Sequence, residues 1–263
     1  MPDSVRVDQA GIDQALVDRY VIEGYVVIDP VIGTEEIDTL RRAAVDAAGA
    51  RPEATLCNTG DGSLRIVYGV HDRAPVYARL TRMPRILALA RRLLGGDVYV
   101  HQTKVTLNTP MAGEGWPWHQ DYAFWSRRDH LPRPDVLSAA VLLDDMLAVN
   151  GPLLMVPGSH RAPVPLTDDG VLGAEQIAEL CHSNGIVATT APAGSVVFFA
   201  GTVVHGSSPN VTPFPRRVLY ITYNRVDNLP EPGGDEPPDY VCSRDTAALA
   251  PLHADEPLLA GAA

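Results

Sequence analysis

The chain has 263 residues, of which 46% are hydrophobic and 20% are charged, a composition typical of a globular protein with an ample core. Its formal net charge of -11 argues against nucleic-acid binding, which usually depends on a basic patch. Three widely spaced cysteines give no disulfide framework, and no signal peptide or long apolar run is recognisable, so we expect a cytoplasmic protein that binds no membrane.

The first third of the chain, about residues 1–96, is expected to form a helical support around one short strand. Apolar residues recur there at helical spacing, and glycine and proline lie where helices usually end or begin. The expected elements are a helix over about 12–20, a strand over 25–28, a helix after Gly33, a polar loop over 51–65 and a helix over 83–94.

From about residue 97 to residue 226 the sequence changes to β-type, with short runs of Val, Ile, Leu, Tyr and Phe between turn residues. Several strands at this spacing suggest a barrel or a double-sheet jelly roll. Residues 227–263 are rich in Pro and Gly at first and then irregular, and we expect one domain overall. Strands are expected over 97–107, 117–124, 136–143, 152–156, 195–204 and 217–226, with a short helix near 173–184.

A possible metal site lies in residues 116–125, a ten-residue window that contains all three tryptophans of the chain. His119 and Asp121 are two residues apart in it, so on a strand they would share a face and offer a nitrogen and an oxygen to one ion. The pair alone is weak evidence, because residues 253–255 form a second His-x-Asp match in the irregular tail, which we interpret as accidental.

Two downstream residues strengthen this interpretation. His205 ends the apolar run 196–205 and could complete a set of two histidines and one carboxylate, the facial triad of non-haem iron. Arg216 heads the next strand and is suited to binding a carboxylate. The alternatives are a structural histidine and a solvated strand end, and for Arg217 we prefer the solvated strand end.

In order and spacing, these four residues resemble the phytanoyl-CoA dioxygenase superfamily of iron(II)/2-oxoglutarate oxygenases. The stretch from Asn150 to Arg161 is also typical of that superfamily. Within it, the pattern is similar to that of ectoine hydroxylases and free amino-acid hydroxylases. The similar segments are 100–102, 118–121 with Trp125, 137–138, 141–143, 205–207 and 212–216.

The resemblance implies a mainly β fold with flanking helices and a double-stranded β-helix (jelly-roll, cupin-like) core. It implies that His119, Asp121 and His205 bind Fe(II), and that 2-oxoglutarate and O2 are cosubstrates. Arg216 would hold the distal carboxylate of 2-oxoglutarate with Ser207 nearby, whereas His160 is expected to be structural. Further cosubstrate candidates are Gln102, Lys104 and Thr106, and the substrate candidates are Gln102, Tyr122, Trp125, Ser138 and Phe214.

The implied function is hydroxylation of an unactivated C–H bond in a small free amino acid or a similar compound, of the proline, leucine or ectoine type. It would be coupled to conversion of 2-oxoglutarate to succinate and CO2. Residues 120–124 depart from the ectoine hydroxylase pattern, so the resemblance supports the reaction class better than the substrate. The alternatives are desaturation or cyclisation by the same chemistry, a non-catalytic metal- or ligand-binding jelly roll, and a zinc hydrolase. A lid could come from 51–65, 161–185 or 229–241.

Overall fold

The computed structural model describes residues 13–161, 170–233, 236–253 and 258–259. The start of the first expected helix, part of the segment 161–185 and Asp255 of the second His-x-Asp match lie outside these residues.

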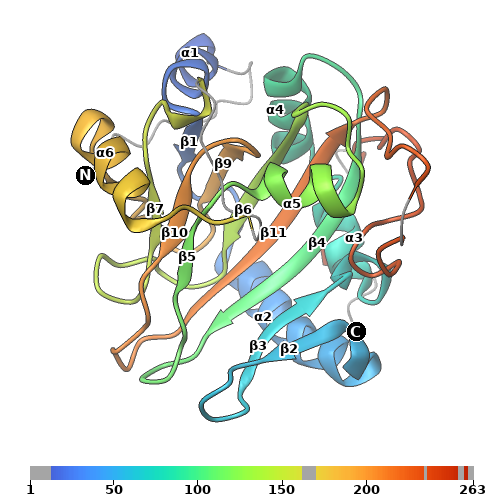
Figure 1. Cartoon of the computed structure of the whole chain (residues 1–263). Coiled ribbons are helices and arrows are strands. Elements are labelled where there is room, and N and C mark those ends of the chain that lie inside the picture. The colour runs from blue at the N-terminus through green and yellow to red at the C-terminus, as the bar shows by residue number, and fades with distance from the viewer. Residues whose placement is uncertain (1–12, 162–169, 234–235, 254–257, 260–263) are drawn as a thin grey trace.

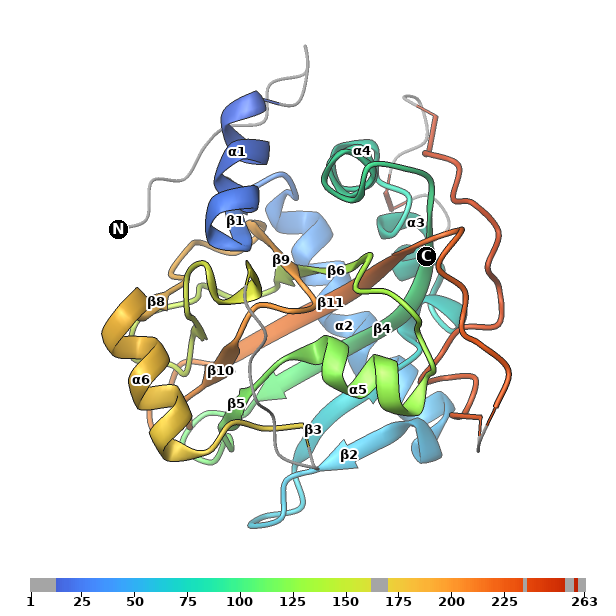
Figure 2. The same ribbon diagram turned by 45° about the horizontal axis from the view of Figure 1, so that its top comes forward.

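Two antiparallel sheets form the centre of the molecule, a seven-stranded sheet in the order β1-β9-β6-β11-β4-β3-β2 and a four-stranded sheet in the order β5-β10-β7-β8. This is the expected jelly-roll, double-stranded β-helix core. In Figures 1 and 2 the smaller sheet and helix α5 lie on one side of β4 and β11, and helix α2 lies on the other.

The elements follow one another along the chain as helices (α), short 3-10 helices (η) and strands (β). They are α1 Gln14–Glu23, β1 Tyr25–Ile28, α2 Thr34–Ala50, η1 Pro52–Ala54, β2 Thr55–Cys57, β3 Leu64–Tyr68, η2 Val70–Asp72, α3 Pro75–Leu80, α4 Pro84–Leu94, β4 Val98–Asn108, β5 Trp116–His119, α5 Asp121–Arg128, β6 Val136–Leu142, β7 Leu153–Met155, η3 Ser159–Arg161, α6 Ala174–Asn184, β8 Val187–Ala188, β9 Val196–Ala200, β10 His205–Ser207 and β11 Arg216–Arg225.

Alternate residues of the central strands fill two separate hydrophobic cores. On β9, Phe198 packs between the large sheet and the helices, whereas Phe199 packs between the two sheets. The same alternation on β11 sends Leu219 to the helical side and Tyr220 to the inter-sheet side. Successive side chains of a strand point to opposite faces, so a strand that is covered on both faces is apolar throughout.

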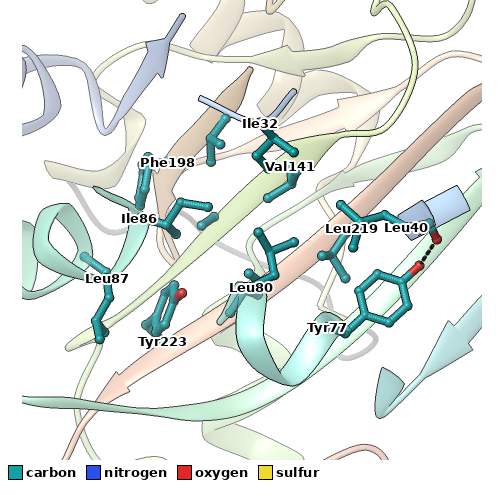
Figure 3. Close-up of a cluster of buried hydrophobic side chains, with 14 of the residues drawn as sticks. Ile32, Leu40, Tyr77, Leu80, Ile86, Leu87, Val141, Phe198, Leu219 and Tyr223 are labelled. Atoms are coloured by element: carbon teal, nitrogen blue, oxygen red, sulfur yellow. Dashed lines mark hydrogen bonds between the residues drawn. The ribbon is translucent and has the colours of Figure 1, made fainter. Parts of the chain in front are cut away.

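Figure 3 shows the helix-facing core, in which Ile86 and Leu87 of α4 pack in one cluster with Phe198 and Leu219 of the sheet. The buried hydroxyl of Tyr77 donates a hydrogen bond of 2.5 Å to the carbonyl of Leu40, which ties α3 to α2 (Figure 3). The helices therefore stabilise the large sheet from the side away from the smaller sheet.

Three expectations about local structure are wrong. The expected strand 117–124 ends at His119, where helix α5 begins. The expected strand 195–204 ends at Ala200, because a turn at Gly201 and Thr202 separates β9 from β10. The expected loop 51–65 contains β2 and the start of β3, which form one edge of the large sheet; edge strands carry more polar residues than central ones and so look like loops.

Candidate metal and cosubstrate site

The two candidate histidine ligands are cross-strand neighbours. His119 is the last residue of β5 and His205 the first residue of β10, and the antiparallel register pairs them directly. Their ring centroids are 4.2 Å apart, and Phe199 packs against the His205 ring at 4.9 Å between centroids. Sheet pairing therefore brings together two residues that are 86 positions apart in the sequence.

Asp121 joins them from a helix rather than from the same strand. Gln120 has extended φ and ψ angles of -117° and 126°, and Asp121 is the first residue of α5. An acidic residue in the first turn is favoured by the helix dipole. The Gln120 side chain donates a hydrogen bond to the carbonyl of Thr202, and the backbone N–H of Tyr122 donates one to the carbonyl of Gly201. These bonds fix the start of α5 to the turn that precedes His205.

The Asp121 carboxylate lies close enough to each histidine to share a metal ion with it. The Nε2 atom of His119 lies 3.6 Å from one Asp121 oxygen, and the Nε2 atom of His205 lies 3.9 Å from the other. Two donors bound to an ion at about 2.1 Å can be at most about 4.2 Å apart. The Nδ1 atoms of His119 and His205 each face a backbone carbonyl, of Pro117 at 2.7 Å and of Val203 at 3.1 Å, which leaves both Nε2 atoms directed toward Asp121.

The electrostatic surroundings keep His205 and Asp121 in the protonation states that bind metal. Burial, together with the nearby His119, lowers the pKa of His205 to about 4, so its imidazole is neutral at pH 7. Burial alone would raise the pKa of Asp121, but the positive charge of Lys104 and the contact with His119 hold it below its ordinary value. A neutral imidazole and an ionised carboxylate are the forms that bind metal.

Arg216 is a buried arginine that contacts Ser207, two residues after His205. It is the first residue of β11 and only 1% exposed, its Nη2 lies 3.4 Å from the Ser207 hydroxyl, and burial lowers its pKa. Its Nε and the hydroxyl of Thr106 are buried without a hydrogen-bond partner among the described residues. Buried polar groups of this kind are normally satisfied, so the unpartnered donors fit a bound carboxylate.

The triad opens into a cavity with two lobes. The larger lobe has a volume of about 430 Å³ and is lined by His119, His205 and Ser207, among others; Ser207 and Tyr220 of its lining both contact Arg216. The smaller lobe has a volume of about 210 Å³. The residues that line both lobes are Leu56, Tyr68, Lys104, Asp121, Phe124 and Arg128.

Several of the predicted cosubstrate and substrate residues line this cavity. Thr106 lines the larger lobe, Gln102 and Trp125 line the smaller one, and Lys104 lines both. Lys104 is half-buried, with its ammonium 5.3 Å from the centre of the Tyr220 ring. It is therefore not an exposed strand lysine.

Three predicted substrate residues lie elsewhere in this structure. The hydroxyl of Tyr122 donates to the carbonyl of Leu131, and the Tyr122 ring packs in a small cluster with Trp125. Ser138 is buried within the sheet, 3.5 Å from the Thr222 hydroxyl. Phe214 is 54% exposed in the loop before β11. None of the three is among the described residues that line either lobe.

The remaining expectations have mixed outcomes. His160 is structural, as expected, because its Nε2 faces the Val21 carbonyl at 3.2 Å and its ring fills the space beside Gly24.

Arg217 is not a solvated strand end: its guanidinium makes two 2.7 Å hydrogen bonds to the buried carboxylate of Asp144. All three candidate lid segments contribute to the cavity lining, through Leu56, Val171 and Tyr240.

Sequence reasoning missed several cavity residues. Arg65 and Tyr68 belong to β3, in and just beyond the segment that was expected to be a loop. Tyr220 could have been found, because it lies four residues after Arg216 on one strand and therefore on the same face. Phe124 lies in the part of α5 that was expected to be a strand, and Arg128 lies in the same helix beyond the expected strand 117–124.

A second buried cluster, formed by His101, Asp129 and Cys242, has a different geometry. The Nε2 atom of His101 faces Asp129 at 2.8 Å, whereas its Nδ1 faces the Cys242 sulfur at 3.7 Å. The carboxylate and the thiol therefore lie at opposite edges of the ring, which does not suit chelation of one ion. Burial raises the pKa of the Cys242 thiol to about 12, so it is protonated at pH 7. The cluster connects β4, the end of α5 and the C-terminal segment.

Comparisons with known proteins agree with this geometry. A profile of the family described as phytanoyl-CoA dioxygenase (PhyH) matches residues 20–218. L-proline trans-4-hydroxylase of Streptomyces griseoviridis is 38% identical over 78% of this chain and 82% of its own. Ectoine dioxygenase of Sphingopyxis alaskensis is 35% identical over 81% of this chain and 76% of its own.

Solved structures of EctD from S. alaskensis have the same fold. The crystal structure with bound Fe gives a TM-score of 0.85 at 34% identity and covers 97% of this chain and 92% of that chain. The structure with 2-oxoglutarate and 5-hydroxyectoine gives a TM-score of 0.86 at 33% identity, with the same coverage. No helix in the described part of this chain is both long enough and apolar enough to cross a membrane.

Proposed function

Because the chain belongs to the phytanoyl-CoA dioxygenase family, we propose that it hydroxylates an unactivated C–H bond of a small amino acid or amino-acid-like compound. Like its relatives, it is an iron(II)- and 2-oxoglutarate-dependent dioxygenase. The observation that carries the proposal is that two imidazoles and one carboxylate meet at a cavity whose lining residue Ser207 contacts a buried arginine, Arg216.

In this proposal His119, Asp121 and His205 hold the iron, and their donor set leaves coordination positions open for other ligands. The distal carboxylate of 2-oxoglutarate binds Arg216, and the hydroxyls of Ser207 and Thr106 add hydrogen bonds. When bound, iron with 2-oxoglutarate and O2 supplies the oxidant that inserts one oxygen atom into a C–H bond, with release of succinate and CO2.

The protein's own contribution is positioning and the exclusion of water. Lys104 adds positive charge where the two lobes meet, so it favours the binding of anionic molecules beside the triad. Gln102 and Trp125 line the smaller lobe, where the substrate would lie, and they offer a polar group and a rigid apolar wall. The small volume of this lobe favours a substrate of a few carbon atoms.

The direct test is a screen of the purified protein with Fe(II), 2-oxoglutarate and O2 against the free amino acids and ectoine, read by mass spectrometry. We expect a product that has gained one oxygen atom, with one succinate formed for each product molecule. Loss of two hydrogen atoms would instead indicate desaturation or ring formation. The absence of any product across the panel would contradict the proposed substrate class.

Asp121→Ala is the control for the metal assignment. The variant should lose bound iron and hydroxylation together, because only two ligands remain. Full hydroxylation by the variant would show that the triad is misassigned.

We also propose that the enzyme works in a reducing compartment such as the cytoplasm. Support for this comes from Cys57, Cys181 and Cys242, which are all free thiols in the structure.

A further inference from the structure

The cavity-facing side of α5 carries a charged group at each end of the helix. Asp121, Phe124, Trp125 and Arg128 occur at spacings i, i+3, i+4 and i+7, so they lie on the same side of the helix. All four line the cavity. Trp125 lines the smaller lobe, and the other three line both lobes. Helix α5 therefore presents a metal ligand in its first turn and a guanidinium at its last residue.

The positive charge of Arg128 has no acidic partner among the described residues. Arg128 is exposed to solvent, and its guanidinium carbon lies 5.1 Å from the centre of the ring of Phe124, a cavity residue one turn earlier on α5. The adjacent Arg127 lies on another side of the helix and lines neither lobe of the cavity. Arg128 is thus directed to the cavity by helix geometry and by an aromatic contact.

The acids around the smaller lobe are already engaged. Glu53 pairs with Arg51 at 3.0 Å, Asp129 faces His101 at 2.8 Å, and Asp121 belongs to the metal triad. Lys104 adds a second positive charge where the lobes meet, and it is close enough to Arg128 for the two charges to repel each other. The lobe is therefore suited to a molecule with a negative group, and it disfavours a cationic one.

The proposed function already assigns one anion, because the distal carboxylate of 2-oxoglutarate binds Arg216 in the larger lobe. A second anion site beside the smaller lobe fits the substrate. With a rise of 1.5 Å per residue, the Cα atoms of Asp121 and Arg128 are about 10 Å apart along the axis of α5. This separation leaves room for a small molecule with one carbon at the metal and a carboxylate at Arg128.

We infer that Arg128 binds the free α-carboxylate of the substrate through its guanidinium, and that this contact makes the enzyme specific for unblocked amino or imino acids. This inference rests on the proposed function and names its substrate class more narrowly. Esters, amides and carrier-bound thioesters lack the negative charge and are poor substrates. Arginine suits this role because its planar fork binds both oxygens of a carboxylate.

The test compares the iron-loaded wild-type enzyme with Arg128→Gln, Arg128→Lys and Arg127→Gln. Each is assayed with the amino acid that gives most product in the screen, L-proline being the first probe, and with the carboxamide of the same compound. The KM for 2-oxoglutarate is measured in parallel. Arg127→Gln is the matched control, because it removes the same charge from the same helix on a side away from the cavity.

We expect Arg128→Gln to raise the KM for the free acid about 10- to 100-fold while the KM for 2-oxoglutarate changes less than about twofold. The wild type should prefer the acid to the amide by a similar factor, and Arg128→Gln should lose that preference. Arg128→Lys should fall between them, and Arg127→Gln should behave as the wild type.

Three results would overturn the inference. The first is a wild type that accepts amide and acid equally, the second is an unchanged KM for the acid in Arg128→Gln, and the third is a change confined to the KM for 2-oxoglutarate. In each of these cases the wild type still hydroxylates an amino acid, so the proposed function stands. A wild type that hydroxylates none of the panel would overturn both.

Discussion

Arg216 and Arg217 are adjacent residues of β11 that serve different purposes because a strand directs them to opposite faces. Arg216 is buried beside Ser207 at the cavity, whereas Arg217 forms a fork with Asp144 on the other face. Asp144 also receives a contact of 2.9 Å from Arg41 of α2. Arginine is therefore placed beside the proposed cosubstrate site at one position and connects helix α2 with the sheet at the next.

These neighbours make a matched pair of variants. Arg216→Ala should raise the KM for 2-oxoglutarate about 10- to 100-fold, because it removes charge-assisted hydrogen bonds to the cosubstrate. Arg217→Ala should leave that KM unchanged and lower the free energy of unfolding by about 1–2 kcal/mol, since the pair with Asp144 is partly exposed. Steady-state kinetics and urea unfolding measure the two effects. An unchanged KM for 2-oxoglutarate in Arg216→Ala, together with a raised KM in Arg217→Ala, would contradict the proposed cosubstrate site.

At the scale of single elements, α5 depends on contacts at both of its ends. Its start is fixed to the turn before His205 through Gln120 and Tyr122, and its end is fixed to β4 through the buried contact of Asp129 with His101. The helix has only eight residues, so its own hydrogen bonds contribute little stability in isolation. The tertiary contacts at its ends therefore determine where its cavity-facing side chains lie.

Asp129→Asn tests the contact at the far end of α5. The variant should unfold at lower urea concentration, with a loss of about 1–3 kcal/mol, because a buried charge-assisted hydrogen bond is weakened. Hydroxylation under conditions where the variant is still folded should fall as well, because the helix that carries Asp121 and Trp125 is less well fixed. The exposed Asp46→Asn is the control and should change neither quantity. A variant as stable as the wild type would argue against this role of Asp129.

The sequence predicted most elements of the core and misassigned the one that carries Asp121. Strands β1, β4, β6 and β11 lie within a residue or two of their expected positions, because apolar runs covered on both faces are easy to recognise. The first half of α5, residues 121–124, was expected to continue a strand because its aromatic residues favour strands. The cavity residues of α5 follow a helical spacing, but this spacing is recognisable only when it is known that the strand ends and the helix begins at Gln120.

Individual ligands were easier to predict than the pocket walls. His119, Asp121, His205 and Arg216 stand in a motif with recognisable order, and the structure brings them together. The pocket walls depend on how loops pack, and Phe214, which was expected to line the pocket, is exposed in the loop before β11. Distances along the chain do not determine that packing.

At the scale of the whole molecule, the two hydrophobic cores differ in their relation to the proposed metal site. The core between the helices and the large sheet contains Phe198 and no ligand of the triad, whereas the core between the sheets contains Phe199, which packs against His205. Consecutive residues of β9 therefore contribute to different parts of the protein, although both are fully buried.

Phe198→Leu and Phe199→Leu should separate these contributions. Each should lower the free energy of unfolding by about 1–2 kcal/mol, because each removes similar buried volume. Only Phe199→Leu should also weaken iron binding, since it loosens the packing that orients His205. Urea unfolding and iron titration of both proteins measure this. Equal loss of iron affinity in the two variants would show that the cores are not separable.

The face of α5 that begins at Asp121 and ends at Arg128 has a consequence for engineering. With the metal at one end and the proposed carboxylate contact at the other, the helix sets the distance between the two in steps of one turn, about 5.4 Å. Exchanging Phe124 and Arg128 would move the positive charge one turn closer to the metal. The site of oxidation on a given amino acid would then shift by a few bonds toward its carboxylate, without any change in the residues that hold the iron.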